Sequence, residues 1–189
     1  MNDRLANLLG ATALNVADLT LSEIRGATGT SGSASAALVV LAEAPDLAVT
    51  DLGQRIGLSQ PAAARMVDGL ESQGLVRRQR GSGRSVAVRL TRGGRRAAVR
   101  LLERRGDVLR RLLAGLDAGE QEVLAALLEK VLSVVHERVE QQAQTPDERI
   151  GEFVCRLCDR VACRQGLASC PVSVAQSVLD GSLGNAREP

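Results

Sequence analysis

The chain has almost no aromatic side chains. Its 189 residues include no tryptophan, no tyrosine and one phenylalanine, Phe153. Proteins that bind single-stranded nucleic acid or RNA stack bases on aromatic side chains, and this chain cannot build such a platform from one ring. Histidine is equally scarce: His136 is the only one, and we expect it to be a surface or interface residue. Among nucleic acids, duplex DNA is therefore the better target.

Other absences exclude further classes of protein. No apolar run approaches the ~18 residues of a membrane span, and the amino terminus lacks a signal-peptide pattern. We find no phosphate-binding loop, no dinucleotide fingerprint and no nucleophile beside His136, so we predict that the chain is not an enzyme. We expect a bacterial cytoplasmic protein with no membrane partner.

Positive charge is concentrated in one part of the chain. The formal net charge is only +2, yet residues 75–111 contain 13 arginines against Glu103 and Asp107, a local balance of +11. Such a concentration is typical of a surface that binds phosphate groups. For the arginines of 95–111, a solvated helix face is an equally good interpretation.

The middle of the chain predicts a helix-turn-helix. Helices are indicated over 5–24 and 31–43, and a short helix over 51–56 is capped by Thr50 and closed by Gly57. Ser59 then begins another helix, with Pro61 in its first turn, where the missing N–H costs nothing. The apolar residues of the pair predict its inner seam: Leu52, Ile56, Met66, Val67 and Leu70. We predict that the outer, N-terminal part of the second helix enters the major groove. Its candidate DNA contacts are Ser59, Gln60, Ala62, Ala63 and Arg65.

A basic hairpin follows at once. Residues 76–80 and 85–90 alternate with period two, which predicts paired strands joined by a glycine-rich turn. Arg84 at the tip of the turn is placed to reach the minor groove, and Arg77 on the first strand is a further candidate contact. Helices over 92–115, capped by Thr91, and 118–143, capped by Asp117, come next. The second has a broad apolar stripe that we expect a partner subunit to cover.

This order of elements resembles the MarR family of bacterial transcription regulators. The likeness covers roughly residues 5–143 and is most specific from Leu58-Ser59-Gln60 to Leu75-Val76-Arg77-Arg78. It implies a mainly α fold with a small β-hairpin wing (α+β), a winged helix-turn-helix that dimerises through its N- and C-terminal helices. It also implies a homodimer that binds a pseudo-palindromic operator in double-stranded DNA, usually as a repressor and often with a small-molecule effector. By matching position, Ser59, Gln60 and Arg65 are recognition-helix contacts and Arg84 the wing contact. Many relatives have an aspartate where this chain has Ser82, so the acidic partner that would orient Arg84 is missing.

The expected organisation has five parts. We expect a dimerisation helix over 1–30, the DNA-binding core over 31–96 and long dimerisation helices over 97–145. A metal-binding segment over 146–180 and a disordered tail over 181–189 complete the chain.

All the cysteines lie in one short stretch. Cys155, Cys158, Cys163 and Cys170 form the pattern C-x2-C-x4-C-x6-C-P within 16 residues. Four thiolates at such spacing can surround a tetrahedral metal ion or an iron–sulfur cluster. Structural zinc usually takes two C-x2-C pairs, whereas a compact run that ends in Cys-Pro is nearer to cluster-binding runs. We predict an iron–sulfur cluster, with zinc as the alternative and a metal-free thiol–disulfide switch as a third possibility.

These observations predict a dimeric DNA-binding regulator, a repressor by resemblance, associated with the nucleoid. Its four-cysteine centre would sense redox or iron state. The alternative is the same regulator with a structural zinc site and a small organic effector. A third hypothesis is a protein-interaction module that uses the winged helix without DNA.

Overall fold

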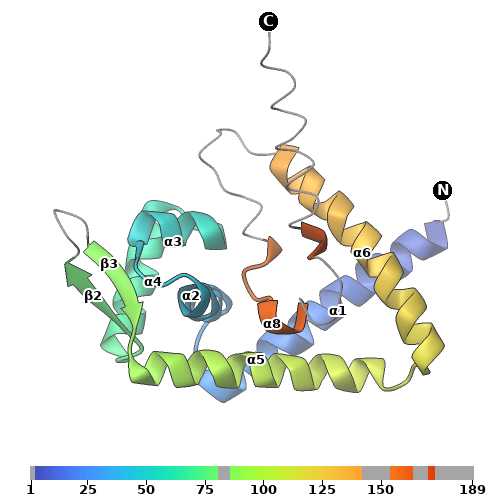
Figure 1. Cartoon of the computed structure of the whole chain (residues 1–189), viewed down its shortest axis with the longest axis horizontal. Coiled ribbons are helices and arrows are strands. Elements are labelled where there is room, and N and C mark those ends of the chain that lie inside the picture. The colour runs from blue at the N-terminus through green and yellow to red at the C-terminus, as the bar shows by residue number, and fades with distance from the viewer. Residues whose placement is uncertain (1–2, 81–85, 142–153, 164–169, 173–189) are drawn as a thin grey trace, which may run out of the picture.

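The structure of the chain is a computed structural model that describes residues 3–80, 86–141, 154–163 and 170–172. Its elements are α1 (Asp3–Thr28), α2 (Gly32–Glu43), β1 (Leu47–Ala48), α3 (Val49–Ile56), α4 (Gln60–Ser72), β2 (Val76–Arg80), β3 (Val86–Leu90), α5 (Arg92–Leu113), α6 (Ala118–Gln141) and α8 (Arg160–Cys163). The predicted fold class is confirmed: the chain is mainly helical, with a small antiparallel sheet at one end (Figure 1).

Local sequence signals account for most helix starts. The Ser31 and Thr91 side chains each accept a hydrogen bond from the backbone N–H three residues on, as N-caps do. Asp117 and Glu120 exchange side-chain to backbone bonds of 2.9 Å, which is a capping box. The expectation for Thr50 is wrong: α3 begins at Val49 after Ala48, so Thr50 lies inside the helix.

The sheet has the strand order β1-β3-β2 and is antiparallel throughout. β2 and β3 form the predicted hairpin, with Val76 opposite Leu90. The two-residue strand β1 was not predicted and pairs Leu47 with Val88. It is held at its start by an ion pair between Asp46 and Arg89 of β3. Side-chain hydrogen bonds from Arg89 lower the pKa of Asp46.

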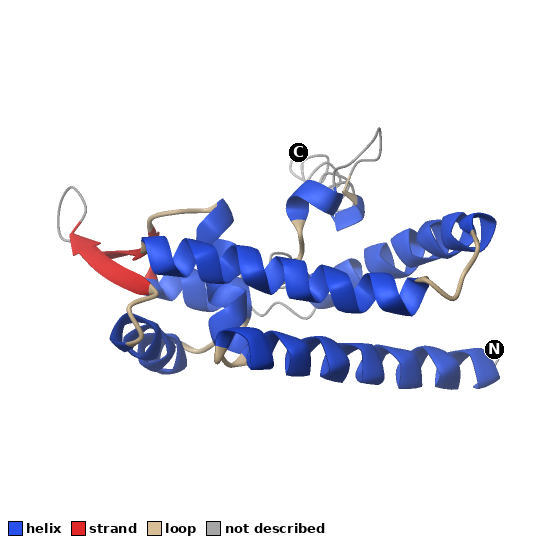
Figure 2. Cartoon of the chain, turned by 90° about the horizontal axis from the view of Figure 1, so that it is seen from below, coloured by secondary structure: helices blue, strands red, loops and turns tan. Residues whose placement is uncertain are grey.

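The main core surrounds α2. Leu38 of α2 is fully buried and belongs to one cluster with Leu52, Leu70 and Val88, so a single helix joins the helix-turn-helix to the sheet. A second, smaller cluster consists of Ile24, Val39 and Leu101 and joins α1, α2 and α5. Figure 2 shows α1 lying along α5, on the side of the molecule away from the hairpin.

Helix α6 runs back from the end of α5 and keeps most of its apolar side chains exposed (Figure 1). The exposed ones include Val123, Leu127, Leu128 and Val131. His136 is the exception: it is fully buried within the single chain, so of the two expectations, a surface or an interface residue, the surface one is wrong. Among the helices described, none is long and apolar enough to cross a membrane.

Candidate DNA-binding surface and cysteine centre

The turn of the helix-turn-helix is set by close packing. Gly57 ends α3 with a φ of 72°, a left-handed conformation that glycine adopts without steric cost. Gly53 on α3 faces Ala63 on α4, and a Cβ at Gly53 would lie 2.8 Å from the Ala63 Cβ. The two helices therefore approach so closely that only a glycine fits at the crossing.

This packing decides which residues of α4 face outward. Ser59, Gln60 and Arg65 are exposed, and Ala62 is partly exposed. Ala63 is fully buried, so its predicted DNA contact is wrong. The physical reason is helical phase: Ala63 shares the inner face with Val67 and Leu70, at spacings of four and seven. The predicted inner seam is confirmed: Leu52, Ile56, Val67 and Leu70 are buried, and Met66 is partly buried.

Among the hairpin arginines whose side chains the structure describes, Arg77 on β2 is the exposed one, as a DNA contact must be. Arg84, the predicted contact at the tip, lies outside the described residues. Ser82 lies outside them too.

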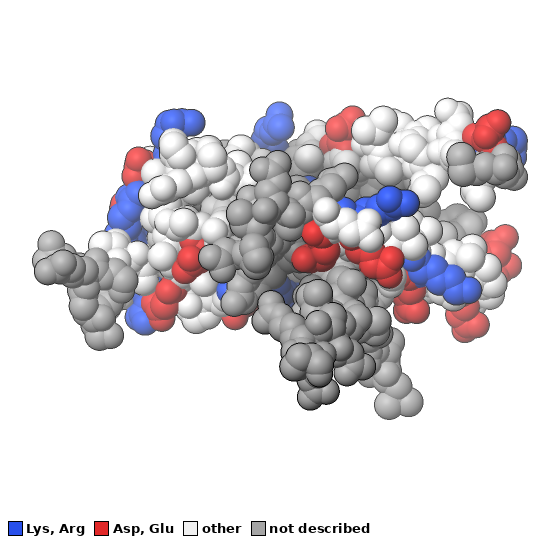
Figure 3. All heavy atoms as spheres, turned by 90° about the horizontal axis from the view of Figure 1, so that it is seen from above, with Lys and Arg blue, Asp and Glu red and all other residues white. Residues whose placement is uncertain are grey.

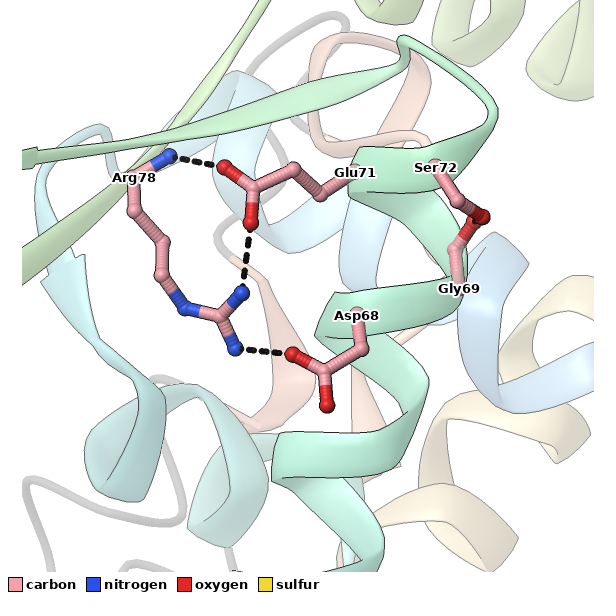
Figure 4. A network of polar contacts seen from close by, with 5 residues as sticks. All are labelled: Asp68, Gly69, Glu71, Ser72 and Arg78. Atoms are coloured by element: carbon pink, nitrogen blue, oxygen red, sulfur yellow. Dashed lines mark hydrogen bonds and ion pairs between the residues drawn. The ribbon is translucent and has the colours of Figure 1, made fainter.

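Arg78 is committed to a contact within the protein (Figure 4). Its guanidinium donates to Glu71 at 2.5 Å and to Asp68 at 2.6 Å, and its backbone N–H donates to Glu71 at 2.8 Å. Both carboxylates belong to α4, so the network ties the hairpin to the recognition helix. The backbone bond from Arg78, followed by the guanidinium bond, lowers the pKa of Glu71. The sequence argument missed this network. The acidic pair at spacing three on α4 was the available signal.

The surface near the hairpin carries both positive and negative charge. On the face shown in Figure 3, basic side chains near the hairpin lie next to acidic ones. The basic excess of residues 75–111 is therefore partly neutralised within the fold, by Glu71 and Asp68 at Arg78 and by Asp46 at Arg89. The arginines that remain exposed include Arg65, Arg77, Arg92 and Arg96.

The cysteine segment lies between α2 and the α1 and α6 helices (Figure 1). A turn brings Cys155 next to Cys158, whose backbone N–H donates to the Cys155 carbonyl at 2.9 Å. Asp159 caps the short α8 by accepting from Val161 and Ala162 at 3.0 Å, and Cys163 ends that helix. The local fold therefore places a turn between the first and second cysteines and a short capped helix between the second and third.

All four cysteines line one small cavity together with Arg160, and its volume is about 30 Å³. Each thiol is partly buried and none forms a disulfide. Among the described residues, no group of three or more His, Cys, Asp or Glu side chains is arranged as a formed site for a metal ion. The structure thus brings the four predicted ligands together around a space, without closing them on a single point.

The thiols influence one another across this space. Burial raises the pKa of Cys163 to about 12, with further contributions from Cys158 and Cys170. Burial and Cys155 raise the pKa of Cys158, whereas the positive charge of Arg105 on α5 opposes that rise. Thiols that are protonated in the absence of a metal become thiolates when a metal binds. The two nearby guanidinium groups, Arg105 and Arg160, would offset the negative charge of such a centre.

A larger cavity of about 570 Å³ adjoins the small one. Its walls come from α1, α2, α5 and α6 and from the cysteine segment, with Val16, Ala36 and Leu132 among the apolar lining residues. Thr20 also lines it, and its buried hydroxyl has no hydrogen-bond partner among the described residues. Arg105 and Arg156 supply positive charge.

A short helix, a glycine turn, an exposed second helix and a tied hairpin together define a winged helix-turn-helix, a class of DNA-binding protein. A family model described as "MarR family" matches residues 28–85. The chain is 30% identical to a MarR family protein from Bacillus stearothermophilus, over 69% of this chain and 95% of that one, with a TM-score of 0.62. The protein belongs to the MarR family, whose members are transcription regulators rather than enzymes.

Two other solved structures are similar. One is the Mycobacterium tuberculosis MarR family protein RV2887 in complex with salicylic acid, 28% identical over 65% of this chain and 95% of that one, with a TM-score of 0.50. The other is MepR, a transcription regulator of the Staphylococcus aureus multidrug efflux pump MepA. It is 17% identical over 69% of this chain and 97% of that one, and its TM-score of 0.63 shows the shared fold. No curated protein matches the chain.

Proposed function

We propose that the protein is a homodimeric repressor that binds a pseudo-palindromic operator in the bacterial nucleoid. The observation that supports operator binding is the exposed start of α4, where Ser59, Gln60 and Arg65 face outward, together with the exposed Arg77 of the hairpin. Glutamine and arginine match the donor and acceptor pattern of base edges in the major groove. The Arg78 network holds the hairpin against α4, so both elements would meet the DNA as one unit.

Exposed apolar side chains support the homodimer. α1 exposes Leu5, Leu8 and Leu14, and α6 exposes Val123 and Leu127. Long helices that expose this many apolar side chains are typical of faces that a second subunit covers. A dimer would also place two recognition helices about one DNA turn apart, near ~34 Å, as a palindromic operator requires.

Operator binding can be tested with a duplex selected from a randomised library. We expect Gln60→Ala and Arg65→Ala each to weaken binding by about 1–3 kcal/mol and to relax sequence preference, because each removes a base-edge contact. Gln73→Ala is the matched control, since Gln73 is an exposed glutamine at the other end of α4. Equal binding by all three variants and the unmodified protein would contradict the proposal.

We propose further that the four cysteines hold an iron–sulfur cluster, through which the regulator senses redox or iron state. The shared cavity supports this proposal: Cys155, Cys158, Cys163 and Cys170 all line it. When bound, a cluster supplies a reversible one-electron centre whose stability depends on iron and oxidants. The contribution of the chain is four thiolates, two flanking arginines and a partly buried environment.

The size of the cavity bears on the choice between a cluster and zinc. Around tetrahedral zinc each sulfur lies ~2.3 Å from the ion, so the sulfurs leave no room for a water-sized sphere. Here the thiols line a space of about 30 Å³, which exceeds the ~10–15 Å³ that one water molecule occupies. This spare space supports the cluster, as does the compact run of cysteines that ends in Cys-Pro.

The test is metal analysis with an absorption spectrum on protein purified without oxygen. A cluster predicts iron, sulfide and broad absorbance near ~400 nm. The Cys158→Ser variant should lose them, whereas Ser133→Ala on α6 should not. Colourless protein with about one zinc per chain would refute the cluster and leave a structural zinc site.

The larger cavity favours a second candidate function, the binding of a small organic effector. Its volume of about 570 Å³ lies within the ~300–1,000 Å³ range of ligand sites. The MarR family protein RV2887 forms a complex with salicylic acid. An aromatic carboxylate would suit the apolar walls and the cations Arg105 and Arg156. A thermal shift with salicylate that Arg105→Gln abolishes would support this function, and no shift at millimolar salicylate would count against it.

A further inference from the structure

Leu157 lies inside the first turn of the cysteine centre. It is flanked by Arg156 and Cys158, and the turn is closed by the hydrogen bond from the Cys158 N–H to the Cys155 carbonyl. Leu157 lies between Cys155 and Cys158, two ligands of the proposed centre, so its backbone would be fixed whenever the metal is bound. The position of this side chain thus depends directly on the state of the centre.

The Leu157 side chain packs against both hydrophobic clusters. It contacts the main cluster of the DNA-binding core, which contains Leu38 and Leu52, and the smaller cluster of Ile24 and Leu101. Within the part of the chain that the structure describes, it is the one partly buried side chain shared by the two. The main cluster includes Val67 and Leu70 of the recognition helix, the smaller cluster includes Ile24 of α1, and α2 and α5 contribute to both. Leu157 therefore lies where α1 meets the core that carries the recognition helix.

The space around this joint leaves room for movement. The cavity of about 570 Å³ borders the cysteine segment on one side and α1, α2 and α5 on the other, so the segment does not fill the cleft completely. Arg105 of α5 lines the same cavity as Cys158. The cysteine segment and α5 therefore face one another across this space. An apolar side chain held in such a partly empty cleft can fix one arrangement of its walls and release it.

We propose that Leu157 is a positioning residue that couples the cysteine centre to the DNA-binding core. With the centre assembled, Leu157 is held between the two clusters and fixes how α1 packs against the DNA-binding core. Without the metal, the turn is free to leave the cleft, and that packing is no longer fixed. This inference rests on the proposed metal centre. It adds the residue through which the centre would act.

The test compares Leu157→Ala with the unmodified protein as full-length dimers, purified without oxygen. Operator affinity is measured for the metal-loaded form and after metal removal by a chelator, together with the iron content per chain. We expect the two forms of the unmodified protein to differ by roughly 5- to 150-fold in affinity, the usual size of an allosteric coupling. We expect Leu157→Ala to keep its iron and to bring this ratio close to one.

Two variants serve as controls. Leu157→Met conserves volume and should keep the ratio. Val161→Ala removes a comparable apolar group that is 72% exposed on the same segment, and it should keep the ratio too. If Leu157→Ala fails to hold iron, Leu157→Val takes its place and should lower the ratio by a smaller factor.

The two proposals fail in different ways. The role of Leu157 would be overturned if Leu157→Ala keeps its iron and still shows the same ratio of operator affinities with and without metal. It would also be overturned if metal removal leaves the operator affinity of the iron-containing unmodified protein unchanged. In both cases the metal centre itself would stand. An unmodified protein that holds no metal in its cysteines would instead refute the centre.

Discussion

Replacing Gly94 by alanine should destabilise the protein strongly, although alanine is the better helix former. Gly94 lies in the first turn of α5, where a Cβ would come within 2.0 Å of the Leu75 carbonyl oxygen. That oxygen is already held by the Thr91 backbone N–H at 3.0 Å and the Thr91 hydroxyl at 3.2 Å. The carbonyl therefore cannot turn aside without losing both bonds, and α5 itself would have to shift.

The size of the effect follows from two opposing contributions. Overpacking costs about 1–3 kcal/mol where side chains can give way, and a main-chain oxygen at this distance places the cost at or above the upper end. The higher helix propensity of alanine offsets about 1 kcal/mol of this loss in stability. We expect a net loss of at least about 2 kcal/mol, which lowers the melting temperature by about 4–8 °C in a chain of this size.

Thermal unfolding at one fixed protein concentration measures this loss. Gly69→Ala is the matched control, because Gly69 lies inside α4 with nothing within 4 Å of a Cβ. That variant should gain about 0.5–1 kcal/mol from its helix preference alone. The two substitutions are chemically identical and should shift the melting temperature in opposite directions. A Gly94→Ala protein as stable as the unmodified one would refute the packing described for this joint.

Three further outcomes are expected. Because Arg78 lowers the pKa of Glu71, the ionised carboxylate stabilises the fold above its unfolded pKa, and this contribution disappears as the pH falls through the lower folded value. Glu71→Gln should therefore be less stable than the unmodified protein at pH 7, and in urea unfolding the difference should shrink as the pH is lowered below the unfolded pKa of about 4.3. A difference independent of pH would contradict the ion pair. Arg77→Ala should weaken binding to all duplexes alike and reduce the salt slope of log K by about 1, whereas Arg25→Ala on α1 should leave the slope unchanged. Leu128→Glu on α6 should give monomers in light scattering, because it places a charge among the exposed apolar side chains, and an intact dimer would place the interface elsewhere.

The helices and the hairpin could be predicted because their signals are local. Thr91 and Asp117 cap the helices that they were expected to cap, and the period-two pattern predicted β2 and β3. The strand β1 was not predicted, because two residues are too few to show a period-two pattern and because its pairing with Val88 joins distant parts of the chain.

The site residues show a different limit. The burial of Ala63 was within reach, since its spacing from Val67 and Leu70 places all three on one helical face. The burial of His136 was not, because it depends on packing of α6 that no local pattern encodes. The Arg78 network also depends on tertiary packing, which brings β2 alongside α4.

The network at Arg78 also limits how this part of the protein can evolve. One planar guanidinium serves Glu71 and Asp68 at once, while its backbone binds Glu71 as well. A lysine keeps the charge but has a single ammonium group, which cannot reproduce this forked arrangement. Positions 68, 71 and 78 should therefore change together among related chains, even though none of them was predicted to touch DNA. The proposed base contacts at positions 60 and 65 would then be free to diverge on a scaffold whose geometry is inherited as a unit.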